Sequence, residues 1–266
     1  SDDLLVTAGG QAWRIPRSAL FYQEARVVNG VRIPGPVQFV GEAEITSAII
    51  QVTRGVPGGV AFLSGHGERA VDDAGNEGLS RAAAELGRSG WMVKSQVITP
   101  GASSKFPEDT RVVVVAGPRK RVADEDLKAL LEVLGRGGGV LALLDPGTDT
   151  GLDPLLNSWN VRLGNDIVMD FQDFISAGDP SSLYVTRFST NHPLGAGMGS
   201  LAVVLPAARR VAIRASDPNP HVIAKNFMQA SGNSWAVKYM LDQKPRVDPN
   251  TDRKGPISVG VACERF

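Results

Sequence analysis

An imidazole and a carboxylate lie two residues apart in the stretch Ser64-Gly65-His66-Gly67-Glu68, directly after an apolar run. Such side chains serve as general acids and bases, as metal ligands, or as hydrogen-bonding supports of a tight loop. Gly65 and Gly67 favour a sharp turn, because glycine adopts positive φ angles without steric cost. The stretch predicts a loop that is either a binding or catalytic site or a structural support, and both alternatives stay open.

Two further apolar runs end in residues that would share a site with this loop. One run is followed by Gly117-Pro118-Arg119 and another by Asp145-Pro146-Gly147. Ligands of open α/β sheets bind beyond the carboxyl ends of the strands, so we expect these loops to face a common crevice. The candidates for binding a ligand or a partner are Ser64, His66, Glu68, Gly117, Arg119 and Asp145.

The sequence lacks the residue patterns that nucleophilic catalysis and metal binding require. The run Val112–Val115 continues into Ala116-Gly117, where a nucleophile elbow would need Ser or Cys. Cys263 lies in a late apolar run, where it would pack as a small hydrophobe. The three histidines have no metal-ligand spacing, and no glycine-rich phosphate loop opens a helix. We therefore expect no catalytic residue, no metal site and no cofactor.

The composition of the chain argues against a nucleic-acid-binding protein and against a membrane-spanning segment. The chain has 266 residues, and its 28 Lys and Arg balance its 28 Asp and Glu, so it has no electrostatic footprint for nucleic acid. No apolar run approaches the roughly 20 residues that span a bilayer. The chain opens without a signal peptide and ends directly after a strand-like run. We expect it to be the soluble portion of a longer protein.

The elements that must position the candidate residues alternate between strands and helices. Continuous apolar runs predict strands over 60–63, 92–97, 112–116 and 140–144, and amphipathic patterns predict helices over 77–90 and 124–135. Strands that alternate with helices favour an α/β fold with a doubly wound, largely parallel sheet.

The remaining segments are less regular. The dipeptides at 9–10 and 29–30 predict β-hairpins, and the pattern over 41–55 predicts a helix. We expect an N-terminal β-hairpin region over 1–40 that packs on an α/β domain over 41–266. Short strand-like runs follow residue 151, and the proline-rich stretch 242–256 predicts an exposed loop.

Several motifs together resemble a known family. They are "FxGExxxTSAI" (39–49), "FLSGHGE" (62–68), "VVVVAGP" (112–118), "GGGVLALLDP" (137–146), "NHP" (191–193), "SGNSWA" (231–236) and "GPISVGVA" (255–262). In this order they resemble the auxiliary component of a bacterial ABC-type transport system, the gliding-motility-associated GldG-type family.

The resemblance implies a flavodoxin-like core, similar to class I glutamine amidotransferase domains. It also implies an extracytoplasmic, periplasmic position, a membrane anchor outside this chain, and ABC permease and ATPase subunits as partners. The family carries no established catalytic residues. We therefore expect a non-enzymatic domain that binds a partner, or a small ligand at the strand-end crevice.

Two other functions compete with this one. The first is an amidotransferase-like or glycan-processing hydrolase that uses His66, Glu68 and Asp145 as acid and base groups. The second is a purely structural interaction domain. A concave pocket with convergent polar groups would favour a ligand site, whereas an exposed apolar patch would favour an interaction domain.

Overall fold

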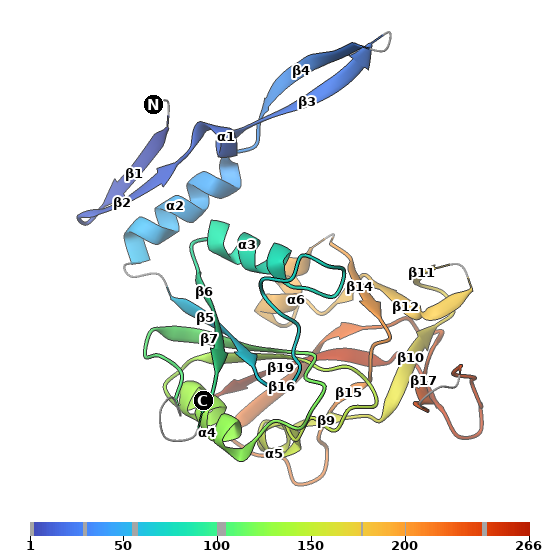
Figure 1. Ribbon diagram of the computed structural model, residues 1–266. Coiled ribbons are helices and arrows are strands. Elements are labelled where there is room, and N and C mark those ends of the chain that lie inside the picture. Colours follow the sequence, from blue (N-terminus) through green and yellow to red (C-terminus); the bar gives the residue numbers. More distant parts are fainter. Residues whose placement is uncertain are drawn as a thin grey trace. The chain divides into compact units, whose positions relative to one another are not determined.

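The computed structural model describes residues 3–28, 31–54, 58–99, 105–176, 178–199, 201–240 and 244–266, and Figure 1 labels their elements. The chain divides into two compact units. The first comprises Ser1–Ser64, Arg69–Val114 and Glu132–Leu141, and the second comprises Gly65–Glu68, Val115–Leu131 and Ala142–Phe266. None of the helices in these ranges is long and apolar enough to cross a bilayer.

Two antiparallel hairpins and two helices open the chain. The hairpin of β1 (Leu4–Ala8) and β2 (Gln11–Ile15) turns at Gly9 and Gly10, whose φ angles are +56° and +80°, as predicted. The second hairpin pairs β3 (Phe21–Val28) with β4 (Val31–Phe39). Its predicted turn at 29–30 lies outside the described residues.

The helices of this segment are α1 (Arg17–Leu20) and α2 (Glu42–Arg54). Helix α2 confirms the helix predicted over 41–55. Its Ala48 is fully buried in a small apolar cluster with Ile15 and Leu20. The cluster therefore draws its residues from the first hairpin, from α1 and from α2, all N-terminal to residue 55.

A four-stranded sheet holds the strand predicted before the Gly65–Glu68 loop. Its strands, in the order β6-β5-β7-β8, are β6 (Met92–Val97), β5 (Gly59–Ser64), β7 (Thr110–Ala116) and β8 (Gly139–Leu143). Strand β5 pairs in parallel with both β6 and β7. The helices are α3 (Ser80–Arg88) and α4 (Asp124–Gly135). The four strands and the parallel sheet are confirmed.

The strands after residue 150 pair differently from the doubly wound parallel sheet that we predicted. They form small antiparallel sheets, with the orders β10-β17-β18, β11-β12-β14, β13-β16-β19 and β15-β9. Among these pairs, only β11 and β12 are joined by a tight turn, whereas partners such as β10 and β17 lie more than 60 residues apart, so tertiary packing and not a short connection sets the pairing. The whole chain is thus a mixed α/β protein.

The elements of this C-terminal region are helices α5 (Asp153–Ser158) and α6 (Pro193–Met198) and strands β9 (Val161–Leu163), β10 (Asp166–Asp170), β11 (Phe174–Ser176), β12 (Asp179–Val185), β13 (Arg187–Phe188), β14 (Val203–Pro206), β15 (Val211–Ile213), β16 (Val222–Gln229), β17 (Ser234–Lys238), β18 (Arg253–Lys254) and β19 (Ser258–Arg265). Sequence patterns did not predict β11, β17 and β18. Strand β18 lies inside the stretch 242–256, of which residues 242 and 243 are outside the described residues.

Strand β10 is the centre of this region's core. All five of its residues are buried. Val168 faces one apolar cluster with Leu183 and Ile257, whereas its neighbours Ile167 and Met169 face a second cluster with Val237. Successive side chains of a strand point to opposite faces, so burial of all five means that β10 is covered on both faces.

Candidate functional site

The loop after β5 turns through two glycines in the left-handed region. The φ angles are +122° at Gly65 and +80° at Gly67. A Cβ atom on Gly67 would lie 3.1 Å from Cβ of Arg119, which is tighter than ordinary van der Waals contact. The backbone carbonyl of His66 accepts hydrogen bonds from the N–H groups of Arg119 and Lys120, both at 2.9 Å. The structure therefore brings the loops after β5 and β7 together, and glycine permits their close approach.

Both nitrogens of the His66 ring lie next to carboxylates. Nδ1 is 3.0 Å from Oε1 of Glu68, and Nε2 is 3.4 Å from Oδ2 of Asp126. The backbone N–H of His66 also donates to Oε2 of Glu68 at 2.7 Å. The side chains of His66, Glu68 and Asp126 are only 15%, 2% and 3% exposed. We call these three residues the buried triad.

Sequence reasoning missed Asp126. The acidic first turn of α4 fits the helix dipole, and that explanation left no reason to look further. A signal was nevertheless present, because Asp126 falls on the apolar stripe of the helix with Ala129, Leu130 and Val133, all of them buried. A carboxylate in a core-facing position needs a polar partner, and His66 is that partner.

Asp126 is the member of the buried triad whose carboxyl is least well satisfied. Burial raises the pKa of its carboxyl above the ordinary value, and the nearby His66 ring and backbone N–H groups oppose this rise. Its Oδ1 is buried and has no hydrogen-bond partner in the described part of the chain. The contact between Oδ2 and the His66 ring thus joins α4 to the loop after β5.

The remaining predicted residues lie on or beside the loops, in different environments. Gly117 is buried with a φ of +61°, and its N–H donates to the carbonyl of Leu143 at 2.8 Å. Arg119 and Asp145 are exposed. The carbonyl of Asp145 accepts a hydrogen bond from Nη1 of Arg209 at 3.2 Å. Ser64 is the last residue of β5, half-buried, and pairs in register with Val97.

Two layers follow from this geometry. The buried triad lies beneath the loop and braces it. An exposed rim, which consists of Gly65, Gly67, Arg119, Lys120 and Asp145, faces solvent. The side chains of the buried triad are thus nearly inaccessible to solvent, whereas the exposed rim is accessible.

Two other polar side chains have local explanations. Burial raises the pKa of the Cys263 thiol to about 11, and its Sγ lies 3.2 Å from the carbonyl oxygen of Trp159. A thiol that stays protonated is a poor nucleophile, in keeping with the predicted packing role. His192 caps α6, because its Nδ1 accepts a hydrogen bond from the N–H of Leu194.

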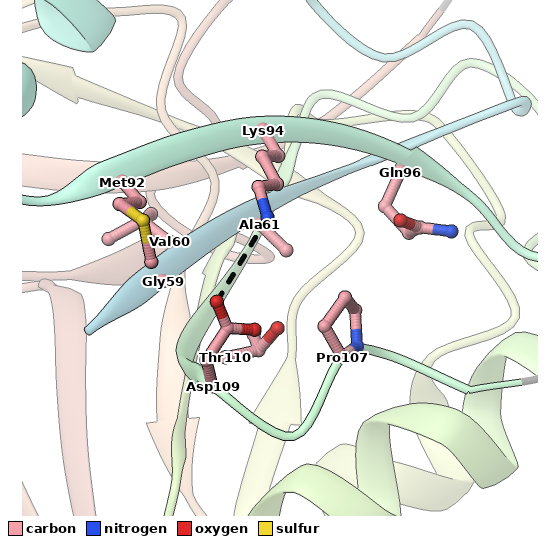
Figure 2. Close-up of a pocket in the computed structure, with 9 residues that line it drawn as sticks. All are labelled: Gly59, Val60, Ala61, Met92, Lys94, Gln96, Pro107, Asp109 and Thr110. Atoms are coloured by element: carbon pink, nitrogen blue, oxygen red, sulfur yellow. Dashed lines mark ion pairs between the residues drawn. The ribbon is translucent and has the colours of Figure 1, made fainter. Parts of the chain in front are cut away.

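A small cavity lies elsewhere, between β5, β6 and the turn before β7. Figure 2 shows its lining, which includes Lys94 of β6 and Asp109, whose charged atoms are 4.0 Å apart. Its volume of about 10 Å³ is close to the minimum for a single water molecule and far below that of a ligand site. Across the described ranges, no group of three or more His, Cys, Asp or Glu is arranged to hold a metal ion.

Comparison with known proteins gives one family and one fold. No curated protein matches the chain. A solved structure described as the mmIFT52 N-terminal domain is similar, with a TM-score of 0.52 and 18% identity over 66% of this chain and 74% of that chain. At this identity the likeness concerns the fold alone. The model of an auxiliary-domain family described as "ABC-type uncharacterized transport system" matches residues 58–266.

That match includes the loop after β5, the buried triad and every sheet from β5 onward. The chain belongs to this family and is an auxiliary domain of an ABC-type transport system.

Proposed function

We propose that this chain is a non-enzymatic, extracytoplasmic binding domain that attaches to the other components of its ABC-type system through the exposed rim. The observation that carries the proposal is the pairing of both His66 ring nitrogens with carboxylates, at 3.0 and 3.4 Å. A general base needs a nitrogen within reach of a substrate proton. Here the ring is instead a brace that fixes the loop, and the fixed loop presents its rim to a partner.

The finer family assignment is also part of the proposal. The chain resembles GldG-type components of gliding-motility or export systems, whose partners are an ABC permease and an ATPase subunit. The strand order β6-β5-β7-β8 is 2-1-3-4 in chain order, and flavodoxin-like sheets begin with this order. This order supports the proposed flavodoxin-like, amidotransferase-like core. Its switch point lies between β5 and β7, and the rim loops follow these two strands and β8.

The proposed compartment rests on the same resemblance. Related components are anchored by membrane helices with this region outside the cytoplasm. Reporter fusions to the full-length protein test the placement, because alkaline phosphatase is active only outside the cytoplasm. If alkaline phosphatase fused to the end of this region is inactive, the region lies in the cytoplasm instead.

The binding role is tested by co-purification of the full-length protein with the permease and ATPase subunits of its own system. The variant Arg119→Glu reverses a charge on the exposed rim, and we expect it to lose the partner while it still unfolds in one cooperative transition. The control is Arg88→Glu on α3, because Arg88 is also exposed, at 60% of its side chain. Loss of the partner in both variants, or in neither, contradicts a role for the rim.

The competing hydrolase is tested on the same preparations. Amide, ester and glycoside substrates should show no turnover above background. A turnover that disappears in His66→Ala or Asp145→Asn, with the fold intact, would replace the binding role by an enzymatic one.

A further inference from the structure

A solvent-open hollow in the C-terminal region is lined by two arginines. It has a volume of about 340 Å³, and its lining residues are Asn157, Arg162, Arg214 and Ser216. Asn157 comes from α5, Arg162 from β9, and Arg214 and Ser216 from the loop after β15. Neither the rim nor the buried triad contributes to it. We propose that this hollow binds a small molecule through an oxyanion group, a phosphate or a carboxylate.

The donors of the hollow suit an oxyanion. Each guanidinium is permanently charged and presents a planar fork of N–H donors that matches the two oxygens of a carboxylate or phosphate. The Asn157 amide and the Ser216 hydroxyl add uncharged donors beside them. Arg162 is exposed, and its side chain forms no hydrogen bond or ion pair with any residue that the structure describes. Its fork is therefore available to a ligand.

Arg214 is oriented by its own loop. Its Nε donates to the carbonyl of Ser216 at 2.9 Å, and Nη2 lies 3.3 Å from Oδ2 of Asp217. The Asp217 side chain is 96% exposed, so this ion pair is weak and leaves most of the positive potential in place. Two guanidinium groups against one solvated carboxylate make the hollow a net cationic site in a chain whose total charge is zero.

The backbone beneath both arginines is fixed by one asparagine. Asn160 is buried, has a φ of +59°, and donates through Nδ2 to the carbonyls of Asn219 and Val222 at 2.9 and 3.0 Å. Its Oδ1 accepts from the N–H of Asn219, and its carbonyl accepts from the N–H of Arg214 at 2.8 Å. Strand β9 pairs with β15, with Arg162 opposite Ala212.

Because these hydrogen bonds already fix the backbone of the hollow, a ligand does not have to order it on binding. Fixing the backbone in advance removes part of the entropy cost of binding, which favours a specific site over a chance meeting of two surface arginines. The volume lies at the lower end of the range for small-molecule sites. The open mouth means that the hollow would hold the anionic end of a molecule and leave the rest exposed.

Titration of the full chain with inorganic phosphate and with acetate, each against chloride at constant ionic strength, tests the proposal. Backbone amide shifts around 157–162 and 214–219 in NMR spectra are the readout. We expect saturable shifts with at least one of the two anions, and the stronger one identifies the oxyanion. Linear shifts that chloride reproduces would overturn the proposal. So would the absence of shifts at anion concentrations of about 10–20 mM, at which a weak ligand with a single charged group should bind.

Matched arginine variants locate the binding. Arg162→Ala should weaken the affinity by about 10-fold or more, the factor expected when a charged donor pair is lost, and Arg162→Lys should recover only part of it. The control is Arg253→Ala, an exposed arginine of β18 outside the hollow. Equal losses in Arg162→Ala and Arg253→Ala would mean general charge attraction and would reject the site. Because the partner is not needed, failure here leaves the rim proposal intact.

Discussion

Within the buried triad, the carboxylate of Glu68 makes contacts with both the backbone and the ring of His66. It binds the backbone N–H and the ring of His66, and only 2% of its side chain is exposed. Glu68→Gln places an amide donor next to one of these groups, so we expect the free energy of unfolding to fall by about 1–3 kcal/mol. Thermal melts measure the loss. The control Glu85→Gln removes a carboxylate whose side chain is 66% exposed. Its free energy of unfolding should lie within about 0.5 kcal/mol of the wild-type value.

An unchanged melt of Glu68→Gln would contradict the bracing role of the triad. If the same variant also lost the partner subunits, Glu68 would instead contact the partner directly. Sequence spacing alone could not separate these outcomes, because it gives the types of residues in a loop but not their burial. Asp126 lies 58 residues beyond Glu68, and only the fold brings it to His66.

Asp170, at the end of β10, predicts a pH-dependent stability. It is 1% exposed; burial raises the pKa of its carboxyl, but hydrogen bonds from Ser231, Gln172 and Asp173 outweigh burial and lower it below the ordinary value. A lowered pKa contributes stability that is present above the pKa of the unfolded chain, about 3.9, and is lost as the pH falls through the folded-state pKa. Asp170→Asn should therefore cost about 2–3 kcal/mol at pH 7.

The same difference should shrink as the pH falls below about 4, because the unfolded wild-type chain binds protons there while the folded carboxyl stays ionised to a lower pH. Urea unfolding of both proteins between pH 7 and pH 3 measures it. The control Asp217→Asn, on a side chain that is 96% exposed, should show no such trend. A gap between wild type and Asp170→Asn that stays constant with pH would contradict the assignment of this stability to the ionised carboxylate.

At the scale of elements, Asn160 joins α5, β9 and the loop after β15. Three side-chain hydrogen bonds and a φ of +59° depend on it. Asn160→Gly keeps the backbone angle and loses the bonds, so we expect a loss of roughly 2–3 kcal/mol. Asn160→Ala should lose about 1 kcal/mol more, because a Cβ disfavours the left-handed region. Thermal melts of the two variants separate the loss of the hydrogen bonds from the cost of the positive φ angle. An alanine variant as stable as the glycine variant would contradict a cost of the left-handed backbone at residue 160.

The elements themselves were predictable to different degrees. The run Val112–Val115 and the periodicity of α4 carry strong local patterns, and both lie where they were expected. Strand β17 was missed because its five residues, "SWAVK", mix polar and apolar types without a clear alternation. The antiparallel order of the C-terminal sheets was also beyond reach, since partners such as β16 and β19 are chosen by tertiary packing and not by local propensity.

At the scale of the whole molecule, the family match begins at residue 58, whereas the predicted domain boundary lies at residue 40. The boundary at 40 stays a prediction, and the apolar packing allows a sharp test. Strands β1 to β4 pair only among themselves in the described sheets, and Ala48 of α2 is buried with Ile15 and Leu20. A chain that starts at residue 41 would keep α2 and remove Ile15, Leu20 and the other residues of the first hairpin and α1 that pack with Ala48.

We therefore expect the fragment 58–266 to fold and the fragment 41–266 to be the worse behaved of the two. The shorter fragment keeps all four strands of the parallel sheet and every C-terminal strand, so its far-UV spectrum and cooperative melt should persist. The longer fragment leaves the α2 stripe without its cluster, and exposed apolar stripes promote self-association. Light scattering and thermal melts of both compare them. If 41–266 is monomeric and melts higher than 58–266, α2 packs on the α/β domain, and the boundary belongs near residue 40.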